Sequence, residues 1–344
     1  MKLEFFKKIL YPIDYLSFRR AGLDISGESI RFVEFLNESG KLSIKNFGEV
    51  LIPEESIKNG EIYNSEGLIK ALSQVKNKIS VTTVTVSIPE EKTYIFEIKL
   101  PEMDFSEIRD ALEFRMEENV PFKNNEVYFE YEIIGQDKKD GGIYLSVSVI
   151  PKKIVEEYTN LLVSVGLFPI SFEIESRIIA QTIIPSGDKR NYIIVDIKDS
   201  STLFSFVEGG VVRFSSTLGI GESYIRNSLL KTGASLEKVE KESIVSPINV
   251  YSVIKDELEK FVDYIKTKRE NNKSELHKVM VCGKSANLPG FLRHISQNLD
   301  VEIELANVWV NLFDTNEYLP PIDFDDSLNY SIAIGLAVPN IKNK

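Results

Sequence analysis

The same order of strands and helices occurs twice along this chain of 344 residues, and a similar short sequence stands at the same point of each copy. The first copy reads Gly-Leu-Asp-Ile-Ser-Gly-Glu-Ser over residues 22–29, and the second reads Ile-Val-Asp-Ile-Lys-Asp-Ser-Ser over residues 194–201. In both, Asp-Ile ends a strand, and a serine follows five positions after the aspartate, where the chain enters a hairpin. A duplicated unit of alternating strands and helices predicts an α/β protein with two related halves.

In the first copy, apolar and β-branched runs predict four strands and one helix. The strands are expected at Ala21–Ile25, Ile30–Leu36, Leu42–Ile52 and Thr82–Ile88. Before the last of these, Leu68, Leu72 and Val75 recur at helical spacing, and Ser65 is expected to cap that helix.

The second copy repeats this order. Its strands are expected at Asn191–Ile197, Leu203–Glu208, Val211–Thr217 and Lys278–Cys282, and its helices at Gly219–Lys231, Pro247–Arg269 and Pro289–Asn298. Gly209 and Gly210 stand between the second and third strands, which is typical of a two-residue hairpin turn.

Between the copies lies an α+β stretch, about residues 93–180. After a first strand, its elements are expected at Phe105–Glu118 (helix), Glu126–Gly135 and Ile143–Ile150 (strands), Ile154–Val165 (helix) and Phe168–Glu173 (strand). This βαββαβ order predicts a separate small open sheet with helices on one side.

Charge and composition exclude several classes of protein. With 41 Lys and Arg against 52 Asp and Glu, the net charge is −11, so the chain lacks the basic footprint of a general nucleic-acid binder. The single cysteine, Cys282, excludes an intramolecular disulfide, and its apolar strand predicts a buried, inert thiol. His277 and His294 lie outside any cluster of metal-ligand residues. The start does not resemble a signal peptide, and no window reaches about 18 apolar residues, so we expect a cytoplasmic protein.

The first twenty residues are the basic part of the chain, and Leu3, Phe6, Ile9, Leu10 and Ile13 are spaced as in an amphipathic helix. Such a helix packs on its own domain, or it docks on a membrane surface or a partner. The sequence leaves these alternatives open.

Five segments carry a resemblance to a known family. They are the hairpin at 22–31, Leu-Pro-Glu-Met at 100–103 with Glu-Asn-Val-Pro-Phe at 118–122, the stretch 165–175, Thr-Gly-Ala-Ser-Leu-Glu-Lys-Val-Glu at 232–240, and Val-Cys-Gly-Lys-Ser-Ala-Asn-Leu-Pro-Gly-Phe at 281–291. In these segments the chain resembles the PilM family, actin-like proteins of type IV pilus machines that are related to the division protein FtsA.

The resemblance implies an α/β fold with an actin-like, ribonuclease-H-like duplicated βββαβα core and an inserted α+β subdomain. It divides the chain into an N-terminal basic and amphipathic extension at 1–20, subdomain 1A at 21–92, the inserted subdomain 1C at 93–180, and a second actin-like half with subdomains 2A and 2B at 181–344.

The resemblance also implies a nucleotide site, in which two hairpins and a turn would hold ATP and Mg²⁺. The implied nucleotide-binding residues are Asp24, Ser26, Gly27, Asp196, Lys198, Ser200, Gly219, Gly221, Gly283, Lys284 and Ser285. Asp24 and Asp196 are the implied Mg²⁺ ligands, through water. Ser26, Lys198 and Lys284 stand where the family usually has glycine. Because a Cβ hinders approach of the backbone to a phosphate, we expect ATP turnover to be slow or absent, and nucleotide binding stays open.

The resemblance implies a scaffold of the pilus assembly platform, in the cytoplasm and peripheral to the inner membrane. Its expected partner is the cytoplasmic N-terminal tail of a PilN-like single-span membrane protein, bound in a groove between the first half of the core and the inserted subdomain. That groove is expected to be lined by Glu126–Gly135, Ile143–Ile150 and Thr82–Ile88. Pilus assembly ATPases and further copies of the chain are additional partners that the resemblance implies.

Two alternatives from other classes remain at this point. An FtsA-like division protein is expected to end in an amphipathic membrane helix after a linker, whereas this sequence stops soon after its last apolar segment. An active ATPase or sugar kinase of the actin and Hsp70 superfamily needs a substrate pocket and a base beside the γ-phosphate.

Overall fold

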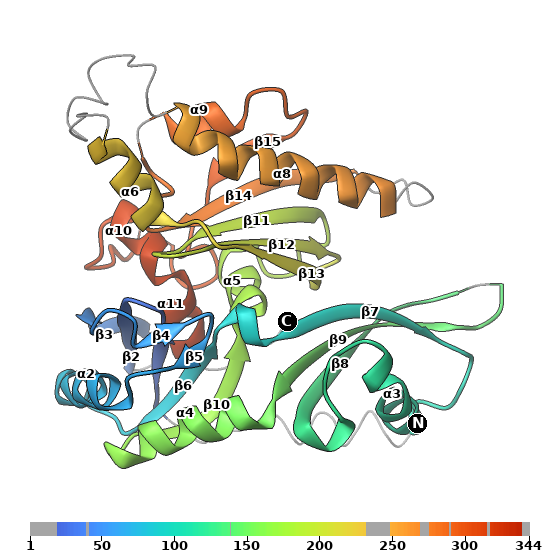
Figure 1. Cartoon of the computed structure of the whole chain (residues 1–344), viewed down its shortest axis with the longest axis horizontal. Helices are drawn as coiled ribbons and strands as arrows, with labels where there is room; N and C mark the ends of the chain where they lie inside the picture. The colour runs from blue at the N-terminus through green and yellow to red at the C-terminus, as the bar shows by residue number, and fades with distance from the viewer. Residues whose placement is uncertain are drawn as a thin grey trace.

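The computed structural model describes residues 19–38, 41–137, 139–231, 248–268, 275–288, 290–314 and 317–338. In these residues the chain forms two five-stranded sheets, one in each half, and a three-stranded sheet that extends sideways from the first half (Figure 1). A short two-stranded hairpin, β4 (Ile57–Lys58) and β5 (Glu61–Ile62), follows β3. The amphipathic segment predicted within residues 1–20 lies, up to residue 18, outside the described residues.

The two large sheets have the same topology. The strand order is β3-β2-β1-β6-β10 in the first and β13-β12-β11-β14-β15 in the second. In each sheet the first three strands in the chain pair antiparallel, and the last two join in parallel. The predicted duplication is therefore confirmed. The bounds are β1 Ala21–Ile25, β2 Ser29–Glu38, β3 Lys41–Leu51, β6 Thr83–Ile88, β10 Phe168–Ile174, β11 Asn191–Ile197, β12 Thr202–Glu208, β13 Val211–Leu218, β14 Leu276–Gly283 and β15 Glu302–Leu305.

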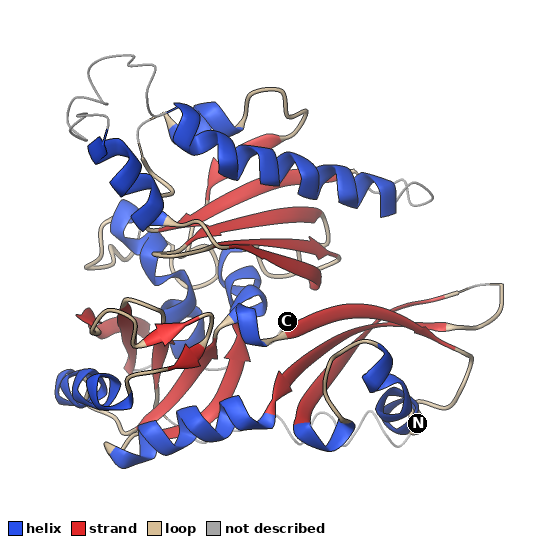
Figure 2. Cartoon of the chain, viewed as in Figure 1, coloured by secondary structure: helices blue, strands red, loops and turns tan. Residues whose placement is uncertain are grey.

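Helices cover the sheets on their outer faces and also separate the two halves. The helices are α2 Ser65–Lys78, α4 Lys152–Ser164, α5 Glu175–Ile183, α6 Glu222–Lys231, α8 Ile248–Lys268, α9 Phe291–Ile295, α10 Phe324–Ser327 and α11 Ser331–Ala337. Of these, α5 and α11 lie between the two sheets (Figure 2). A Cβ at Gly22 of β1 would collide with the Ala333 carbonyl and lie 2.5 Å from the Ala337 nitrogen, so α11 packs directly on this strand.

The inserted stretch differs from the prediction in its last strand. Only β7 (Tyr94–Leu100), β8 (Val127–Gln136) and β9 (Ile143–Pro151) form the separate sheet, in the order β7-β9-β8, with α3 (Ile108–Arg115) packed against it. The predicted βαββαβ sheet is wrong, because β10 pairs in parallel with β6 of the first large sheet. The helix before it, α4, packs into the core of that sheet through Ile154, Tyr158 and Leu162.

Two smaller differences concern the ends of helices, and one predicted turn is confirmed. Asn64, and not Ser65, caps α2, with its side chain accepting a hydrogen bond of 2.9 Å from the Gly67 N–H. Helix α9 begins only at Phe291, after Gly290 in a left-handed conformation; Pro289, predicted to start it, lies outside the described residues. The hairpin turn at Gly209–Gly210 is confirmed, with positive φ at both glycines, as the tight turn requires.

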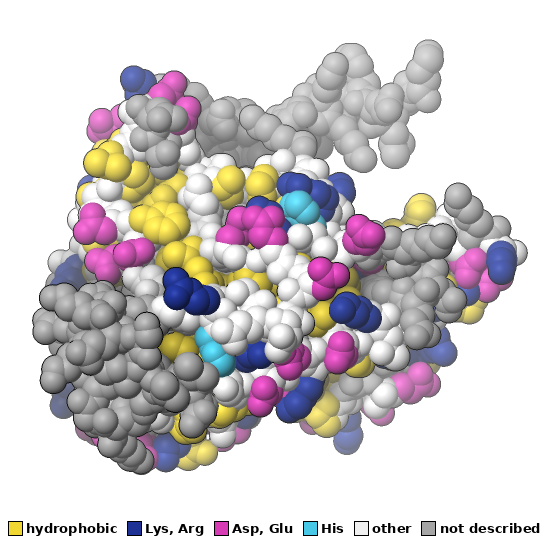
Figure 3. Space-filling view, turned by 90° about the horizontal axis from the view of Figure 1, so that it is seen from above, with side chains coloured by type: hydrophobic (Ala, Val, Ile, Leu, Met, Phe, Trp, Pro, Cys, Tyr) yellow, Lys and Arg dark blue, Asp and Glu magenta, His cyan; other side chains and the backbone are white. Residues whose placement is uncertain are grey.

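The apolar side chains form three buried clusters, one under each sheet. The largest belongs to the second half and includes Ile194, Phe204 and Trp309 together with residues of α5 and α11. No helix in the described part of the chain is long and apolar enough to cross a membrane. Over the second half, Figure 3 shows acidic and basic side chains interspersed with apolar ones on the described part of the surface.

Candidate functional site

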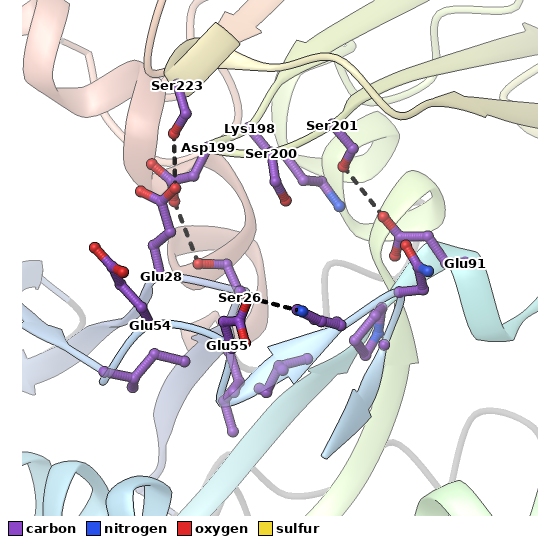
Figure 4. A pocket seen from close by; sticks show the side chains of 18 of the residues that line it. Ser26, Glu28, Glu54, Glu55, Glu91, Lys198, Asp199, Ser200, Ser201 and Ser223 are labelled. Atoms are coloured by element: carbon purple, nitrogen blue, oxygen red, sulfur yellow. Dashed lines mark hydrogen bonds and ion pairs between the residues drawn. The ribbon is translucent and has the colours of Figure 1, made fainter. Parts of the chain in front are cut away.

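A cleft of about 800 Å³ lies between the two halves, where the two equivalent hairpins meet. Its lining comes from the β1–β2 hairpin, the segment 51–60 after β3, the start of α5, the β11–β12 hairpin and the start of α6. Figure 4 shows the polar side chains that line it. Of the residues implied for the nucleotide site, Ser26, Gly27, Lys198 and Ser200 line this cleft. Asp24, Asp196, Gly283 and Lys284 line a small hollow that shares Ser26 and Lys198 with it.

Both hairpins are shaped by the same local hydrogen bonds. The Ser26 N–H donates to the Ser29 carbonyl at 2.9 Å, and the Lys198 N–H donates to the Ser201 carbonyl at 2.9 Å. The hairpins also approach each other closely, because a Cβ on Gly27 would lie 3.6 Å from the Ser200 Oγ. The duplicated sequence thus brings its two copies face to face across the cleft.

The carboxylate of Asp199, at the tip of the second hairpin, is the centre of a buried network. Its Oδ2 lies 3.2 Å from the Arg31 guanidinium and 3.4 Å from the Ser26 hydroxyl, and its Oδ1 accepts from the Lys284 ammonium at 2.8 Å. The Asp199 side chain is only 2% exposed. Burial would raise the pKa of Asp199, but Arg31 and Lys284 outweigh burial and hold that pKa below its usual value.

Arg31 also contacts acidic side chains of its own half of the molecule. It stands opposite Asp24 in the β1–β2 register, 3.9 Å from its Oδ2, and it contacts Glu49 of β3 at 2.9 Å. Although burial lowers the pKa of Arg31, Asp199 and the other carboxylates raise it above its ordinary value, so the guanidinium stays charged. Arg31 therefore joins β1, β2 and β3 of one half to the second hairpin of the other.

Lys198 of the second hairpin points to the opposite side of the cleft, toward Glu175 at the start of α5. The two side chains form a close ion pair, and Glu175 also accepts a hydrogen bond of 2.8 Å from the Glu90 N–H. Burial lowers the pKa of Lys198, but the carboxylates of Glu175, Glu91 and Asp196 outweigh this and raise it. Lys198 therefore places a permanent positive charge among the acidic groups of the cleft.

Asp24 and Asp196, the implied Mg²⁺ ligands, are both buried at the ends of equivalent strands. Asp24 accepts a hydrogen bond of 3.1 Å from Ser87, and Asp196 accepts one of 3.6 Å from the Cys282 thiol. Burial raises the pKa of Asp24, against the effect of Arg31, and raises the pKa of Asp196 to about 6. Within the described residues, the Asp196 Oδ2 has no hydrogen-bond partner.

The remaining predicted residues divide between the cleft and its walls. Ser200 lines the cleft, whereas Gly219, Gly221 and Ser285 do not. Gly221 packs against the second hairpin, where the N–H groups of residues 222 and 223 donate to the carbonyls of residues 198 and 199 at 2.8 and 2.9 Å. Gly283, with φ of 91°, packs on the backbone of Ile197. The first amide groups of α6 are thus already bonded within the protein.

Sequence reasoning missed Asp199, Arg31 and Glu175. A signal for Asp199 existed, because in the aligned copies it takes the position of Gly27, so the two hairpins differ there by a charged side chain. Arg31 interrupts an apolar strand directly opposite Asp24. Glu175 gave no such signal, since its position beside Lys198 depends on the packing of α5.

The charged side chains that line the cleft are mainly acidic. Among the described residues lining the cleft, six are acidic and two are lysines: Glu28, Glu54, Glu55, Glu91, Glu175 and Asp199 against Lys58 and Lys198. A triphosphate would meet this acidic surface, while Arg31 and Lys284 are already bound to Asp199. In the described part of the chain, no three His, Cys, Asp or Glu side chains are placed to hold a metal ion.

A second hollow, of about 190 Å³, lies between the inserted sheet and the first half. It is lined by Tyr128–Glu130 of β8, Ser148 and Ile150 of β9, Val155 of α4, Phe172–Ile174 of β10 and Arg177 of α5. Arg177 closes one end, with ion pairs to Glu130 at 3.3 Å and Glu132 at 2.5 Å. The sequence placed a groove here but expected β6 to line it. Instead β10 does, because β10 is the edge strand beside β6.

Comparison with known proteins adds to this geometry. A family model described as type IV pilus assembly protein PilM matches residues 22–341. Among solved structures, a PilM-PilN type IV pilus biogenesis complex is similar with 16% identity, covering 93% of this chain and 97% of that one, with a TM-score of 0.69. That likeness shows the fold, the actin-like ATPase fold.

Two further structures are more distant. A protein from Bacteroides thetaiotaomicron with an actin-like ATPase fold is 9% identical, with 89% and 96% of the two chains covered and a TM-score of 0.42. The activator of the 2-hydroxyisocaproyl-CoA dehydratase from Clostridium difficile, which has ADPNP bound, is 11% identical, with 93% and 92% covered and a TM-score of 0.45.

Proposed function

The chain belongs to the PilM family of type IV pilus assembly proteins, and on this premise we propose that it binds the extended N-terminal tail of a PilN-like membrane protein in the groove between β8 and β10. A partner of that kind would hold this chain at the inner membrane as a scaffold of the pilus assembly platform. The choice of partner is supported by the solved PilM-PilN complex, which is similar to this chain.

The observation that carries the proposal is the pair of sheet edges at this groove. β8 ends the three-stranded sheet and β10 ends the first large sheet, and both line the same hollow. An extended peptide can join such an edge through main-chain hydrogen bonds, with alternate side chains entering pockets. β8 offers the better edge, since β10 contains Pro169, and the irregularity of β8, between Ile133 and Gly135, lies outside the residues that line the hollow.

The side chains of the groove suit an apolar anchor on the tail. Tyr128 is 52% exposed beside the hollow, with the Lys152 ammonium 5.3 Å from its ring centre, and Val155 lies on the adjacent face of α4. Aromatic side chains at the centre of an interface often carry much of the binding energy. Because the tail must be ordered on binding, we expect an affinity on the order of micromolar.

ATP and Mg²⁺, which the resemblance implied, are not part of this proposal. The acidic lining of the cleft and the internal partners of Arg31, Lys198 and Lys284 argue against them. The FtsA-like and kinase alternatives have no supporting feature in the described residues comparable to the groove.

The proposal is tested by fluorescence anisotropy with a labelled N-terminal peptide of a PilN-like protein from the same organism. Tyr128→Ala should weaken binding about tenfold, since truncating an interface aromatic costs on the order of 1–2 kcal/mol. Val155→Arg should block the groove. The matched control is Tyr144→Ala, a tyrosine on β9 of the same sheet that lies outside the groove and is 38% exposed. Unchanged affinity in both groove variants would show that the tail binds elsewhere.

A further inference from the structure

Three groups from separate parts of the fold converge on one carboxylate in the cleft. Ser26 comes from the β1–β2 hairpin, Arg31 from β2 and Lys284 from the turn after β14, and all three contact Asp199 at 2.8 to 3.4 Å. The first two belong to one half of the molecule, and Lys284 and Asp199 belong to the other. A guanidinium, an ammonium and a hydroxyl aimed at one point form an anion-binding site.

The anion in this site is the protein's own. Asp199 stands at the tip of the second hairpin, in the position that Gly27 takes in the first, and its side chain reaches Ser26 and Arg31 of the first half. It is almost completely buried, and both of its oxygens are engaged. A phosphate in the cleft would therefore compete with this carboxylate for Arg31 and Lys284.

The positive charge beside this site, on Lys198, also comes from the protein itself. The Lys198 ammonium stands among the carboxylates of Glu175, Glu91 and Asp196, where a bound cation would otherwise be required to offset their charge. Asp199 and Lys198 are adjacent in the sequence, so one hairpin supplies both the anion and the cation of the cleft.

We propose that Asp199 is a built-in anion that occupies the phosphate-binding position of the cleft, joins the two halves through Arg31 and excludes nucleotides. The arrangement of the two halves then depends on the chain's own charges and not on the binding or hydrolysis of ATP. This inference concerns the cleft and does not depend on the tail-binding groove, which shares no lining residue with it.

The proposal predicts that removing Asp199 exposes an anion site. Binding of pyrophosphate and of Mg·ATP is measured by calorimetry on the full chain for wild type, Asp199→Asn and Asp199→Ala. Wild type should bind neither ligand up to millimolar concentration, whereas the two variants should bind pyrophosphate at least about tenfold more tightly than wild type. Pyrophosphate should also raise the thermal midpoint of the variants and leave that of wild type unchanged.

The matched control is Glu54→Gln, which changes the charge of the cleft by the same amount without touching Arg31 or Lys284. It should behave as wild type. Adding Arg31→Gln to Asp199→Asn should abolish the gained affinity. Binding of Mg·ATP or pyrophosphate to wild type that Asp199→Asn leaves unchanged would overturn the proposal, as would folded Asp199 variants that bind no pyrophosphate.

Loss of folding is also informative, because Asp199→Asn removes one of the anions that balance buried Arg31 and the carboxylate that pairs with Lys284. A variant that folds only when pyrophosphate or sulfate is present supports the proposal, since the added ion then replaces the missing carboxylate. If both variants stay unfolded at anion concentrations of tens of millimolar, on the order used to fill weak anion sites, Asp199 has another role and the proposal is wrong.

Discussion

Replacing Arg31 by methionine tests the buried network from its cationic side. The substitution keeps the length of the side chain and removes the guanidinium that lies 3.2 Å from Asp199, 3.9 Å from Asp24 and 2.9 Å from Glu49. Asp199 and Asp24 are both nearly inaccessible to water, so neither carboxylate can recover its hydration after the change. The free energy of unfolding should therefore fall.

The expected loss can be estimated from the partners that remain. Removing one member of a buried ion pair costs about 3–5 kcal/mol, because the other charge is left uncompensated. Asp199 keeps Lys284 and Ser26, and Glu49 is 34% exposed and can turn to water. We therefore expect the lower end, about 3 kcal/mol.

Urea unfolding measures this loss. Trp309 is the single tryptophan and is buried in the core of the second half, so its fluorescence reports unfolding there, and far-UV circular dichroism reports both halves. The control is Arg190→Met, which removes an exposed ion pair with Asp188 and should cost less than about 1 kcal/mol. A similar small loss for Arg31→Met would refute the reasoning.

The pH dependence of the stability loss in Arg31→Met gives a second test of the buried network. In wild type the pKa of Asp199 is depressed, so its contribution is present above the ordinary aspartate pKa and is lost as the pH falls through the folded-state value. In Arg31→Met, loss of the guanidinium should raise the pKa of Asp199 and should raise further that of Asp24, which burial already holds above its ordinary value. The folded variant then binds more protons than the folded wild type, so the penalty should be smaller at pH 5 than at pH 7. An equal penalty at both pH values would contradict the assignment.

Two further outcomes follow from the packing. Gly22→Ala should destabilise the protein by about 1–3 kcal/mol, because its Cβ would collide with the backbone of α11, whereas Gly135→Ala, with open space around it, should stay within about 0.5 kcal/mol in the same unfolding assay. Cys282 is completely buried and burial raises the pKa of its thiol, so a maleimide should label it only after unfolding, and rapid labelling of the folded protein would show that β14 is not the buried strand described here.

Much of the fold could be predicted from local patterns. The alternation of apolar residues in Ile30–Leu36 and the helical spacing of Leu68, Leu72 and Val75 depend only on near neighbours in the chain, and the structure places a strand and a helix there. The repeated Asp-Ile before each hairpin likewise predicted two equivalent units, and the two sheets share one strand order. The family resemblance then supplied the expected cleft.

The sheet that a strand joins cannot be predicted from the local pattern of that strand. Phe168–Ile174 has a strand pattern wherever it pairs, and its choice of β6 over β8 depends on which edge remains free once both sheets have formed. The topology shows this in retrospect, since β10 takes the same place as β15 in the other half. Sequence order alone assigned it to the inserted sheet and therefore named the wrong strand for the groove.

The sequence by itself determined the strands and helices, the duplication and the altered loops, because these follow from side-chain size, polarity and spacing along the chain. Only the tertiary structure decided what the loops do in which Ser26, Lys198 and Lys284 stand in place of glycine. From the sequence alone, Asp199 is expected to be a solvated loop residue. The structure places Arg31, 168 positions away, and Lys284, 85 positions away, in contact with it. Electrostatic interactions act through space and strengthen on burial, so the role of a charge depends on which distant groups the fold brings to it.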